Sequence, residues 1–179
     1  MTQQHLDCGA AAAHAGLTPL RLEQLSRIAR ATADLGGSVL MQHYGQLVSI
    51  RQKARAGDLV TDADLAAEKA VLNGLGEATP EIPVLAEESG AQGDVSDLCW
   101  CVDPLDGTTN FAHGYPFFAT SIGLLWRGLP ILGAVAIPFL QEVFWCCPGM
   151  GAFLNDQRIQ VSNCSTLEDS LLVLSLIHI

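Results

Sequence analysis

Two aspartates, Asp103 and Asp106, lie three residues apart in a run that reads Trp-Cys-Val-Asp-Pro-Leu-Asp-Gly-Thr-Thr-Asn-Phe over residues 100–111. An apolar, β-type stretch precedes Asp103, and Pro104 predicts a turn directly after it. Two carboxylates that leave a strand at this spacing can bind one hard cation through their oxygens. Without a cation, two ionised groups ~4 Å apart would repel by about 4 kcal/mol at an effective dielectric constant of roughly 20.

Small residues follow the second aspartate. The backbone N–H groups of Gly107 and Thr108 suit an oxyanion bound at the start of a helix. A bare Asp-Gly pair most often forms only a turn, with Asp103 as a cap. The full run contains two acids, a proline and two threonines, and this combination favours a site for a metal ion and a phosphate.

Two further acidic segments lie upstream of this run. Residues 57–64 contain three aspartates, and residues 86–89 place Glu87 and Glu88 at the end of a predicted strand. Thr61 or one of the aspartates is expected to be a helix N-cap, and two adjacent glutamates alone are typical of a solvated loop. One cap does not need three aspartates, however. Three acidic segments at three loop ends therefore predict convergence on metal ions.

The charge balance agrees with a metal site. The chain has 19 acidic and 9 basic residues, a formal net charge of −10, and no run of lysine or arginine. A nucleic-acid partner is therefore not expected. An acidic protein can accept an anionic substrate such as a phosphate ester only if bound cations offset the carboxylates. With 179 residues, 49% of them hydrophobic, the chain is long and apolar enough for a well-buried domain.

Cysteine usage and hydropathy suggest a cytoplasmic protein. The six cysteines include no Cys-x-x-Cys pair, and a chain with this much core does not need a disulfide framework. We therefore expect reduced, buried thiols. No basic segment followed by an apolar one begins the chain, so no signal peptide is expected. The longest apolar run, residues 117–140, is interrupted by Arg127, Gly128 and two prolines, which indicates paired strands and no membrane span.

The elements that position these residues follow from periodicity. Residues 1–17 are predicted to be a flexible extension. Thr18-Pro19 is typical of a helix start, and this helix is expected to end near Gly45 or earlier, at Gly36-Gly37. A second helix begins near residue 62 or 64, places Leu65, Glu68 and Leu72 on one face, and ends at Gly74 or Gly76. A strand at 82–86 and short β-type runs then follow, at 98–102, 119–126, 131–137, 143–147, 151–154 and 158–161. Helices followed by antiparallel hairpins indicate an α+β fold.

The chain resembles the inositol monophosphatase family, which belongs with fructose-1,6-bisphosphatases to a superfamily of lithium-sensitive, magnesium-dependent phosphatases. The matching stretches are residues 57–64, 86–89, 100–111 and 149–155, within a resemblance from about residue 20 to about residue 173. The Asp-Pro-Leu-Asp-Gly-Thr run is highly specific for the superfamily, and Thr109-Asn110-Phe111 is similar to its inositol monophosphatase branch. The fold implied is a layered αβαβα sandwich.

The resemblance also implies the metal ligands. Glu87, Asp103, the Leu105 carbonyl and the Thr108 hydroxyl would hold a first Mg²⁺ ion. Asp103 would bridge to a second Mg²⁺ shared with Asp106. Lys53 matches a lysine near the first acidic segment and is treated as peripheral.

Catalytic and substrate-binding roles follow from the same resemblance. Asp64 and Thr108 would orient and deprotonate the attacking water. Asp106, Gly107, Thr108 and Thr109 would contact the substrate, with two of their backbone amides on the phosphate. Glu88 would lie behind the metal ligands.

The activity implied is hydrolysis of inositol monophosphate or a similar sugar or polyol phosphate by two-metal-assisted attack of water. Alternatives are a fructose-1,6-bisphosphatase or a phosphatase for histidinol phosphate or nucleotide phosphates. An alternative of another class is a regulatory binding protein linked to RNA metabolism, or an inactive fragment. Family members imply lithium sensitivity and a homodimer.

Parts of the family pattern do not occur in the chain. A Trp-Asp-x-Ala stretch, which completes the second metal site in relatives, is absent. Residues 18–173 are thus expected to form the N-terminal catalytic portion of the fold, with the second α/β half largely missing. Residues 174–179 do not resemble the family and are predicted to be a non-native tail. We expect the 179-residue chain alone to be poorly soluble or inactive.

Overall fold

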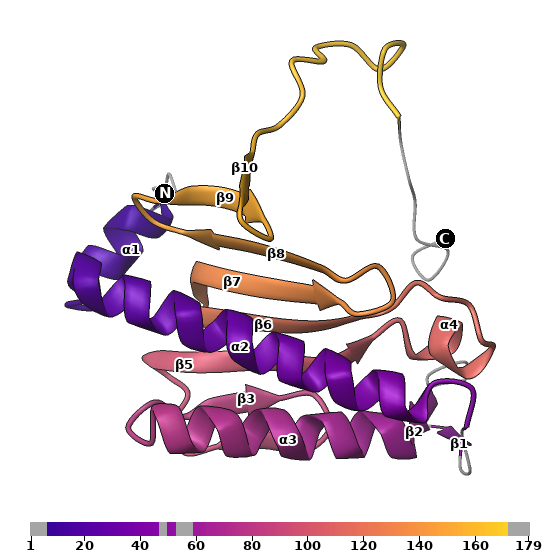
Figure 1. The fold of residues 1–179 in the computed structure, drawn as a ribbon. Helices are drawn as coiled ribbons and strands as arrows, with labels where there is room; N and C mark the ends of the chain where they lie inside the picture. Colours follow the sequence, from indigo (N-terminus) through magenta and orange to yellow (C-terminus); the bar gives the residue numbers. More distant parts are fainter. Residues whose placement is uncertain (1–6, 47–49, 53–58, 172–179) are drawn as a thin grey trace.

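The fold is a layer of helices on one face of a sheet. The computed structural model describes residues 7–46, 50–52 and 59–171. The two long helices, α2 and α3, lie side by side across the sheet (Figure 1). The predicted α+β class is therefore confirmed. The helices are α1 (Cys8–His14), α2 (Pro19–His43), α3 (Asp62–Ala78) and α4 (Thr108–Ala112).

The main sheet has eight strands in the order β10-β9-β8-β7-β6-β5-β3-β4. Only β3 and β5 pair in parallel, and the remaining pairs are antiparallel. Two short strands, β1 (Ile50–Gln52) and β2 (Leu59–Thr61), form a separate antiparallel pair. The strands of the main sheet are β3 (Val84–Ala86), β4 (Gly90–Gln92), β5 (Leu98–Asp106), β6 (Ala119–Trp126), β7 (Leu129–Ile137), β8 (Glu142–Cys147), β9 (Gly151–Leu154) and β10 (Gln157–Ile159).

Strand β5 is longer than the sequence predicts. It was expected to end at Asp103, because Pro104 was read as a turn, but it continues to Asp106. The pairing with β6 is irregular between these two aspartates. A proline is tolerated there because its missing N–H falls where the ladder is already interrupted. The Pro104 carbonyl instead accepts a hydrogen bond from the buried Thr120 hydroxyl at 3.0 Å.

Helix α2 runs through both of its internal glycines. Thr18 caps it by accepting a hydrogen bond from the Arg21 amide at 3.2 Å. A Cβ atom on Gly36 would lie 2.8 Å from the Thr120 Cγ2 atom, and one on Gly37 would lie 3.1 Å from the Pro138 Cβ atom. The glycines therefore allow close approach of the helix to the sheet, and they do not break it.

Helix α3 begins as predicted but ends later. Gly74 and Gly76 lie inside it, and the helix continues to Ala78. At its end the Thr79 hydroxyl donates to the Leu75 carbonyl at 2.9 Å and accepts from the Trp100 indole N–H at 2.9 Å.

The face that Leu65 shares with Glu68 is only partly buried, because Leu65 is 51% exposed. The helix is turned so that two acidic side chains lie on the inner face. Its buried residues are Ala63, Asp64, Ala67, Glu68, Val71 and Leu75.

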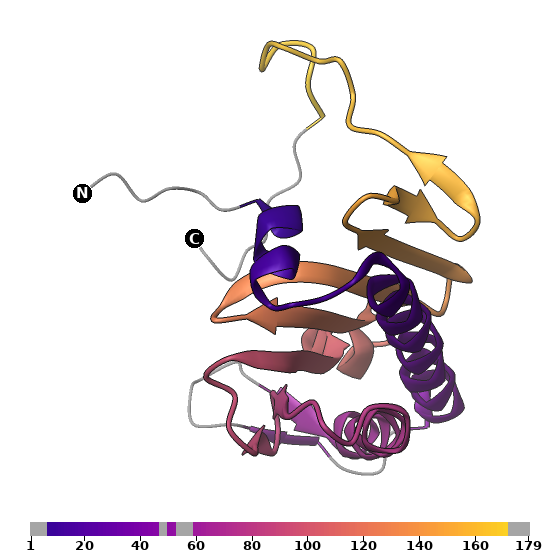
Figure 2. The ribbon, with the colours of Figure 1, turned by 90° about the vertical axis from the view of Figure 1, so that its left-hand side faces the viewer.

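The N-terminal segment is more ordered than expected. Residues 8–14 of the predicted extension form α1, which Asp7 caps by accepting from the Ala10 amide at 2.7 Å. Ala11 and Ala12 are buried in the core, and His14 stacks on Trp126. An alanine-rich run has high helix propensity, and its small side chains let α1 pack beside β7 (Figure 2).

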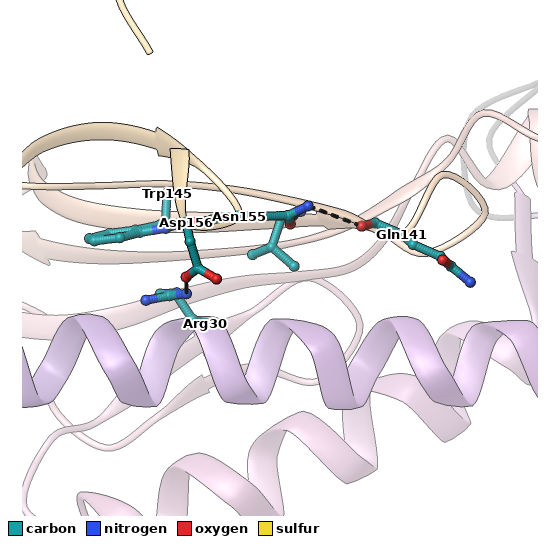
Figure 3. Close-up of polar contacts among 6 residues, drawn as sticks. Arg30, Gln141, Trp145, Asn155 and Asp156 are labelled. Carbon is teal, nitrogen blue, oxygen red and sulfur yellow. Dashed lines mark hydrogen bonds and ion pairs between the residues drawn. The ribbon is translucent and has the colours of Figure 1, made fainter. Parts of the chain in front are cut away.

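The β9–β10 turn ties the end of the sheet to α2. Asn155 adopts a left-handed conformation (φ 52°), its side-chain amide donates to the Gln141 carbonyl at 3.3 Å, and its own carbonyl accepts from the Trp145 indole at 2.8 Å (Figure 3). Arg30 of α2 lies over the Trp145 ring at 4.4 Å and pairs with Asp156 at 3.4 Å. Asn155 and Asp156 thus form the turn between the two strands that the sequence predicts at 151–154 and 158–161.

Two predictions about surfaces have mixed outcomes. The apolar run at 117–140 forms β6 and β7, and none of the helices described is long and apolar enough to cross a membrane.

All six cysteines are unpaired, but only Cys99 and Cys147 are buried. The expectation of buried thiols is wrong for Cys8, Cys146 and Cys164, which are exposed.

A small hydrophobic cluster supports the end of β5. It joins the last turn of α2, the first turns of α3, the end of β5, helix α4 and the start of β6. This cluster fixes three segments that carry predicted site residues, α3, the end of β5 and α4, because packed interiors resist displacement. Its members are Leu40, Ala63, Ala67, Leu105, Phe111 and Phe118.

Candidate active site

Carboxylates from two neighbouring strands meet at the end of β5. The parallel pairing of β3 with β5 places Ala86 opposite Val102, and the Glu87 amide donates to the Val102 carbonyl at 3.0 Å. Glu87 therefore leaves β3 beside Asp103, and the two side chains are hydrogen-bonded. Asp106 lies near enough for its charge to act on Asp103. The predicted convergence of two acidic segments is present in the fold.

Asp103 carries the strongest electrostatic signal at this site. The pKa of Asp103 is raised to about 8. Burial is the largest cause, followed by the charge of Glu87, the hydrogen bond with Glu87 and the charge of Asp106. A hydrogen bond from the Leu105 amide at 3.1 Å opposes the shift only in part. Three crowded carboxyl groups thus hold a proton near neutral pH. A cation bound among them would displace that proton.

The third acidic segment reaches the same place through α3. Asp64 is fully buried, and its Oδ2 atom accepts from the Thr61 amide at 2.8 Å and the Thr61 hydroxyl at 2.6 Å. This is a capping box, since Thr61 also accepts from the first amides of the helix. The Oδ1 atom accepts from the Thr108 hydroxyl at 3.2 Å. Burial raises the pKa of Asp64, while the hydrogen bonds from Thr61 and Thr108 lower it.

The turn after Asp106 brings Thr108 to Asp64. Gly107 has a φ of 91°, and a Cβ atom there would lie 3.1 Å from the Phe117 carbonyl. Glycine alone suits this left-handed and crowded position. The Thr108 hydroxyl lies 3.0 Å from the Leu105 carbonyl, to which it can also donate. These two oxygens are the neutral donors that the resemblance assigns to the first cation.

The remaining substrate residues face solvent. Asp106 and Thr109 are exposed, and Gly107 is half-buried. They border the carboxylates on the open side of the site. A ligand bound there would contact Asp106 and Thr109 without displacing the core.

The donor set suits a hard divalent cation. Every candidate ligand is an oxygen, from carboxylates, a hydroxyl or a carbonyl, which is the chemistry that Mg²⁺ prefers. Within the described residues, no group of three or more His, Cys, Asp and Glu side chains lies ready to hold a metal ion. A single cation held by Glu87, Asp103, Leu105 and Thr108 would need only two acids, with a carbonyl and a hydroxyl as the other ligands.

Some residues predicted for the site lie away from Asp103, and others are outside the part of the chain that the structure describes. Lys53, Asp58 and the tail 174–179 are not among the described residues. Asp62 lies 3.9 Å from the His43 ring and not among the carboxylates around Asp103. Glu88 is half-buried.

Glu68 is a residue that the sequence analysis did not assign to the site. It is buried in α3, and its Oε2 atom accepts from the Glu88 amide at 2.9 Å. The signal available in the sequence was its spacing, since it follows Asp64 by one helical turn and so shares its face.

A cavity elsewhere in the fold does not contain these residues. It measures about 910 Å³ and lies between α2 and the turns at the ends of β7 and β9, where its lining includes Arg27, Arg30, Asp34, Asn155 and Asp156. Arg30 pairs with Asp156, and Arg27 pairs with Glu23. Because Arg27 and Arg30 already pair with acidic side chains, this cavity is a weaker candidate for an active site than the carboxylates at Asp103.

Comparison with known proteins agrees with this geometry. Residues 21–178 match the model of the inositol monophosphatase family. The chain belongs to this family. It is 45% identical over 157 residues to the inositol-1-monophosphatase of Synechocystis sp. (strain ATCC 27184 / PCC 6803 / Kazusa). The aligned residues cover 87% of this chain and 55% of that protein.

Two further proteins are similar to the chain. The Nus factor SuhB of Pseudomonas aeruginosa is 37% identical over 156 residues, covering 84% of this chain and 57% of SuhB. The structure of inositol monophosphatase from Anabaena (Nostoc) sp. PCC 7120 matches with a TM-score of 0.70 at 39% identity, covering 80% of this chain and 52% of that one. The chain thus spans about half the length of these relatives.

Proposed function

We propose that these residues belong to a Mg²⁺-dependent phosphomonoesterase that hydrolyses inositol monophosphate or a similar small sugar or polyol phosphate. The observation that carries the proposal is the gathering of Glu87, Asp103 and Asp106 beside the Asp64–Thr108 pair. Carboxylates that raise the pKa of Asp103 to about 8 are poorly compensated unless a cation is present. Membership of a phosphatase family supports the reaction class.

Glu87, Asp103, the Leu105 carbonyl and the Thr108 hydroxyl would hold one Mg²⁺, and Asp103 and Asp106 would share another. The cations, when bound, would neutralise charge on the phosphate and the leaving oxygen and acidify the attacking water. The amides of Gly107 and Thr108 would bind the phosphate oxygens. Asp106 and Thr109 are exposed and would contact the polyol part of the substrate.

Asp64 and Thr108 would handle the proton of the attacking water. The Thr108 hydroxyl donates to the Asp64 carboxylate at 3.2 Å, so its oxygen can accept a proton from water while its own proton passes toward Asp64. Burial raises the pKa of Asp64, which makes the carboxylate a better base than an exposed one. The water oxygen would form a bond to phosphorus, the P–O ester bond would break, and the leaving alkoxide would become the alcohol by taking up a proton from solvent, while the proton passed to Asp64 returns to solvent.

The proposal applies to the complete gene product. The chain covers 55% of the length of its Synechocystis relative, and the Trp-Asp-x-Ala stretch expected at the second cation is absent from it. We propose that the 179-residue chain alone is inactive. Lithium inhibition, a homodimer and a cytoplasmic location stay predictions.

A second candidate is a regulatory role through binding. It is favoured by the 37% identity to a protein named Nus factor SuhB. The absence of any Lys/Arg run and the net charge of −10 weigh against direct contact with nucleic acid. Such a role would therefore rest on a protein partner.

A substrate panel tests the proposal. Phosphate release would be measured from myo-inositol 1-phosphate, fructose 1,6-bisphosphate, histidinol phosphate and a nucleotide monophosphate, with Mg²⁺ and with a chelator. We expect Mg²⁺-dependent release, fastest from the inositol ester. No release from any ester at any Mg²⁺ concentration would reject the phosphatase and leave the binding role.

A further inference from the structure

Glu68 is a buried carboxylate without a role in the chemistry described so far. It is 4% exposed and lies on α3, on the same face as Asp64 and one turn further along. Burying a carboxylate costs several kcal/mol of desolvation unless its oxygens gain partners. An apolar side chain of similar size would pack there more cheaply, so packing alone does not account for a glutamate.

The partner of Glu68 lies in the turn that carries a metal-ligand candidate. Its Oε2 atom accepts from the Glu88 amide at 2.9 Å, across 20 residues of sequence. A hydrogen bond to an ionised acceptor is roughly twice as strong as a neutral one. Helix α3 thereby fixes the backbone of the turn after β3.

The turn has two backbone anchors, one on each side of the Glu87 Cα atom. On one side the Glu87 amide donates to the Val102 carbonyl of β5 at 3.0 Å. On the other side the Glu88 amide donates to Glu68. Together the anchors set the direction of the Glu87 side chain, which meets Asp103.

We propose that Glu68 is a positioning residue that holds Glu87 in place to bind a divalent cation together with Asp103. Helix α3 then carries two groups of the site at one helical spacing: Asp64, which meets Thr108, and Glu68, which fixes the Glu87–Glu88 turn. This inference rests on the proposed function, because it assigns Glu87 to the cation.

The test compares Glu68→Leu with Glu68→Gln in the complete gene product. Leucine fills the space but cannot accept the Glu88 amide, whereas the glutamine carbonyl can. Glu77→Leu is the matched control, because Glu77 is an exposed residue of the same helix. Affinity for Mn²⁺ alone, a hard cation with a preference for oxygen ligands, would be measured by calorimetry. Hydrogen exchange of the Glu88 amide would be measured in cation-free protein.

We expect Glu68→Leu to weaken Mn²⁺ binding by about 10- to 100-fold, as is typical when a group behind a metal ligand is removed. Exchange of the Glu88 amide should accelerate in parallel. Glu68→Gln should stay within about 3-fold of wild-type affinity and retain the protection, and Glu77→Leu should match wild type in both measurements.

Four outcomes separate the hypotheses. If Glu68→Leu only lowers the melting temperature and binds Mn²⁺ like wild type, Glu68 is structural and the inference is wrong. If Glu68→Gln loses as much affinity as Glu68→Leu, the hydrogen-bond acceptor is not what matters, and the inference also fails. If wild type itself binds no Mn²⁺, the proposed function fails. If Glu68→Leu leaves the hydrogen exchange of the Glu88 amide unchanged, the positioning contact is refuted, whatever the result for Mn²⁺.

Discussion

Asp103 is the residue at which the charges of the site are least balanced. Its pKa of about 8 lies far above the ordinary value of 3.8, because of burial and of the neighbouring Glu87 and Asp106 charges. In cation-free protein between roughly pH 4 and pH 8, the folded state therefore holds a proton that the unfolded state has released. Unfolding free energy must then fall as the pH rises through this window.

We predict that cation-free protein loses about 2 kcal/mol of unfolding free energy between pH 5 and pH 8. A full shift over three pH units would give about 4 kcal/mol, but Asp103 is half-buried and solvent screens part of its interaction. Chemical unfolding in a chelator would measure the change, with Asp103→Asn as the comparison. The neutral variant should show a flatter profile and should exceed wild type in stability at pH 8. Equal pH dependence in both proteins would contradict the assignment of the proton.

At the scale of elements, the contact of α2 with the sheet depends on Gly36. A Cβ atom there would lie 2.8 Å from the Thr120 Cγ2 atom and 2.9 Å from the Val71 Cγ2 atom. Both neighbours are buried and β-branched, and Thr120 also holds the Pro104 carbonyl. A shift of Thr120 to make room for the added Cβ atom would therefore move β5, the strand that carries Asp103.

We predict that Gly36→Ala lowers the unfolding free energy by about 1–2 kcal/mol, since overpacking outweighs the gain in helix propensity. Gly76→Ala is the control: this glycine lies in α3 with nothing within 4 Å of the added Cβ atom, so the substitution should stabilise by up to about 1 kcal/mol. Thermal and urea unfolding of both variants would decide the matter. A stabilised Gly36→Ala protein would mean that α2 does not approach β6 as described.

The sequence predicted the strands well and the helix ends less well. Alternation and turn residues located β6 and β9 at their observed bounds, because each strand has one buried face and a clear turn signal. Helix α2 ends at His43, close to the predicted stop at Gly45, and runs through the alternative stop at Gly36-Gly37. Glycine misled at α3, which continues through Gly74 and Gly76 to Ala78.

The same contrast holds within the site. Local motifs pointed to Asp64, Glu87 and Asp103, and the structure brings these segments together at one end of β5. The role of Glu68 was not visible, because it depends on a hydrogen bond between α3 and a turn 20 residues away. Spacing along a helix cannot reveal which loop packs beside it.

At the scale of the whole molecule, α2 and α3 cover one face of the sheet, and none of the helices described covers the other. On the face turned away from these helices, half-buried residues such as Val135 and Phe144, which are paired across β7 and β8, line an apolar hollow of about 480 Å³. Exposed apolar patches of this kind favour self-association.

We predict that the 179-residue chain alone self-associates at micromolar concentration and that Phe144→Asp reduces this association. Leu20→Asp is the control, because Leu20 is 66% exposed at the start of α2 and lies outside the hollow. Sedimentation velocity would measure the distribution of sizes. A monomeric wild-type chain, or an equal effect of both substitutions, would argue against this face as the cause.

The carboxylates around Asp103 are proposed to bind the cations that a phosphatase needs. The most direct test is phosphate release from myo-inositol 1-phosphate by the complete gene product and its Asp103→Asn variant, with and without Mg²⁺. Asp97→Asn is the control, since Asp97 pairs with Arg127 at the surface. We expect Mg²⁺-dependent release by wild type and Asp97→Asn, and a loss beyond about 100-fold in Asp103→Asn. Release by Asp103→Asn at the wild-type rate would contradict the account.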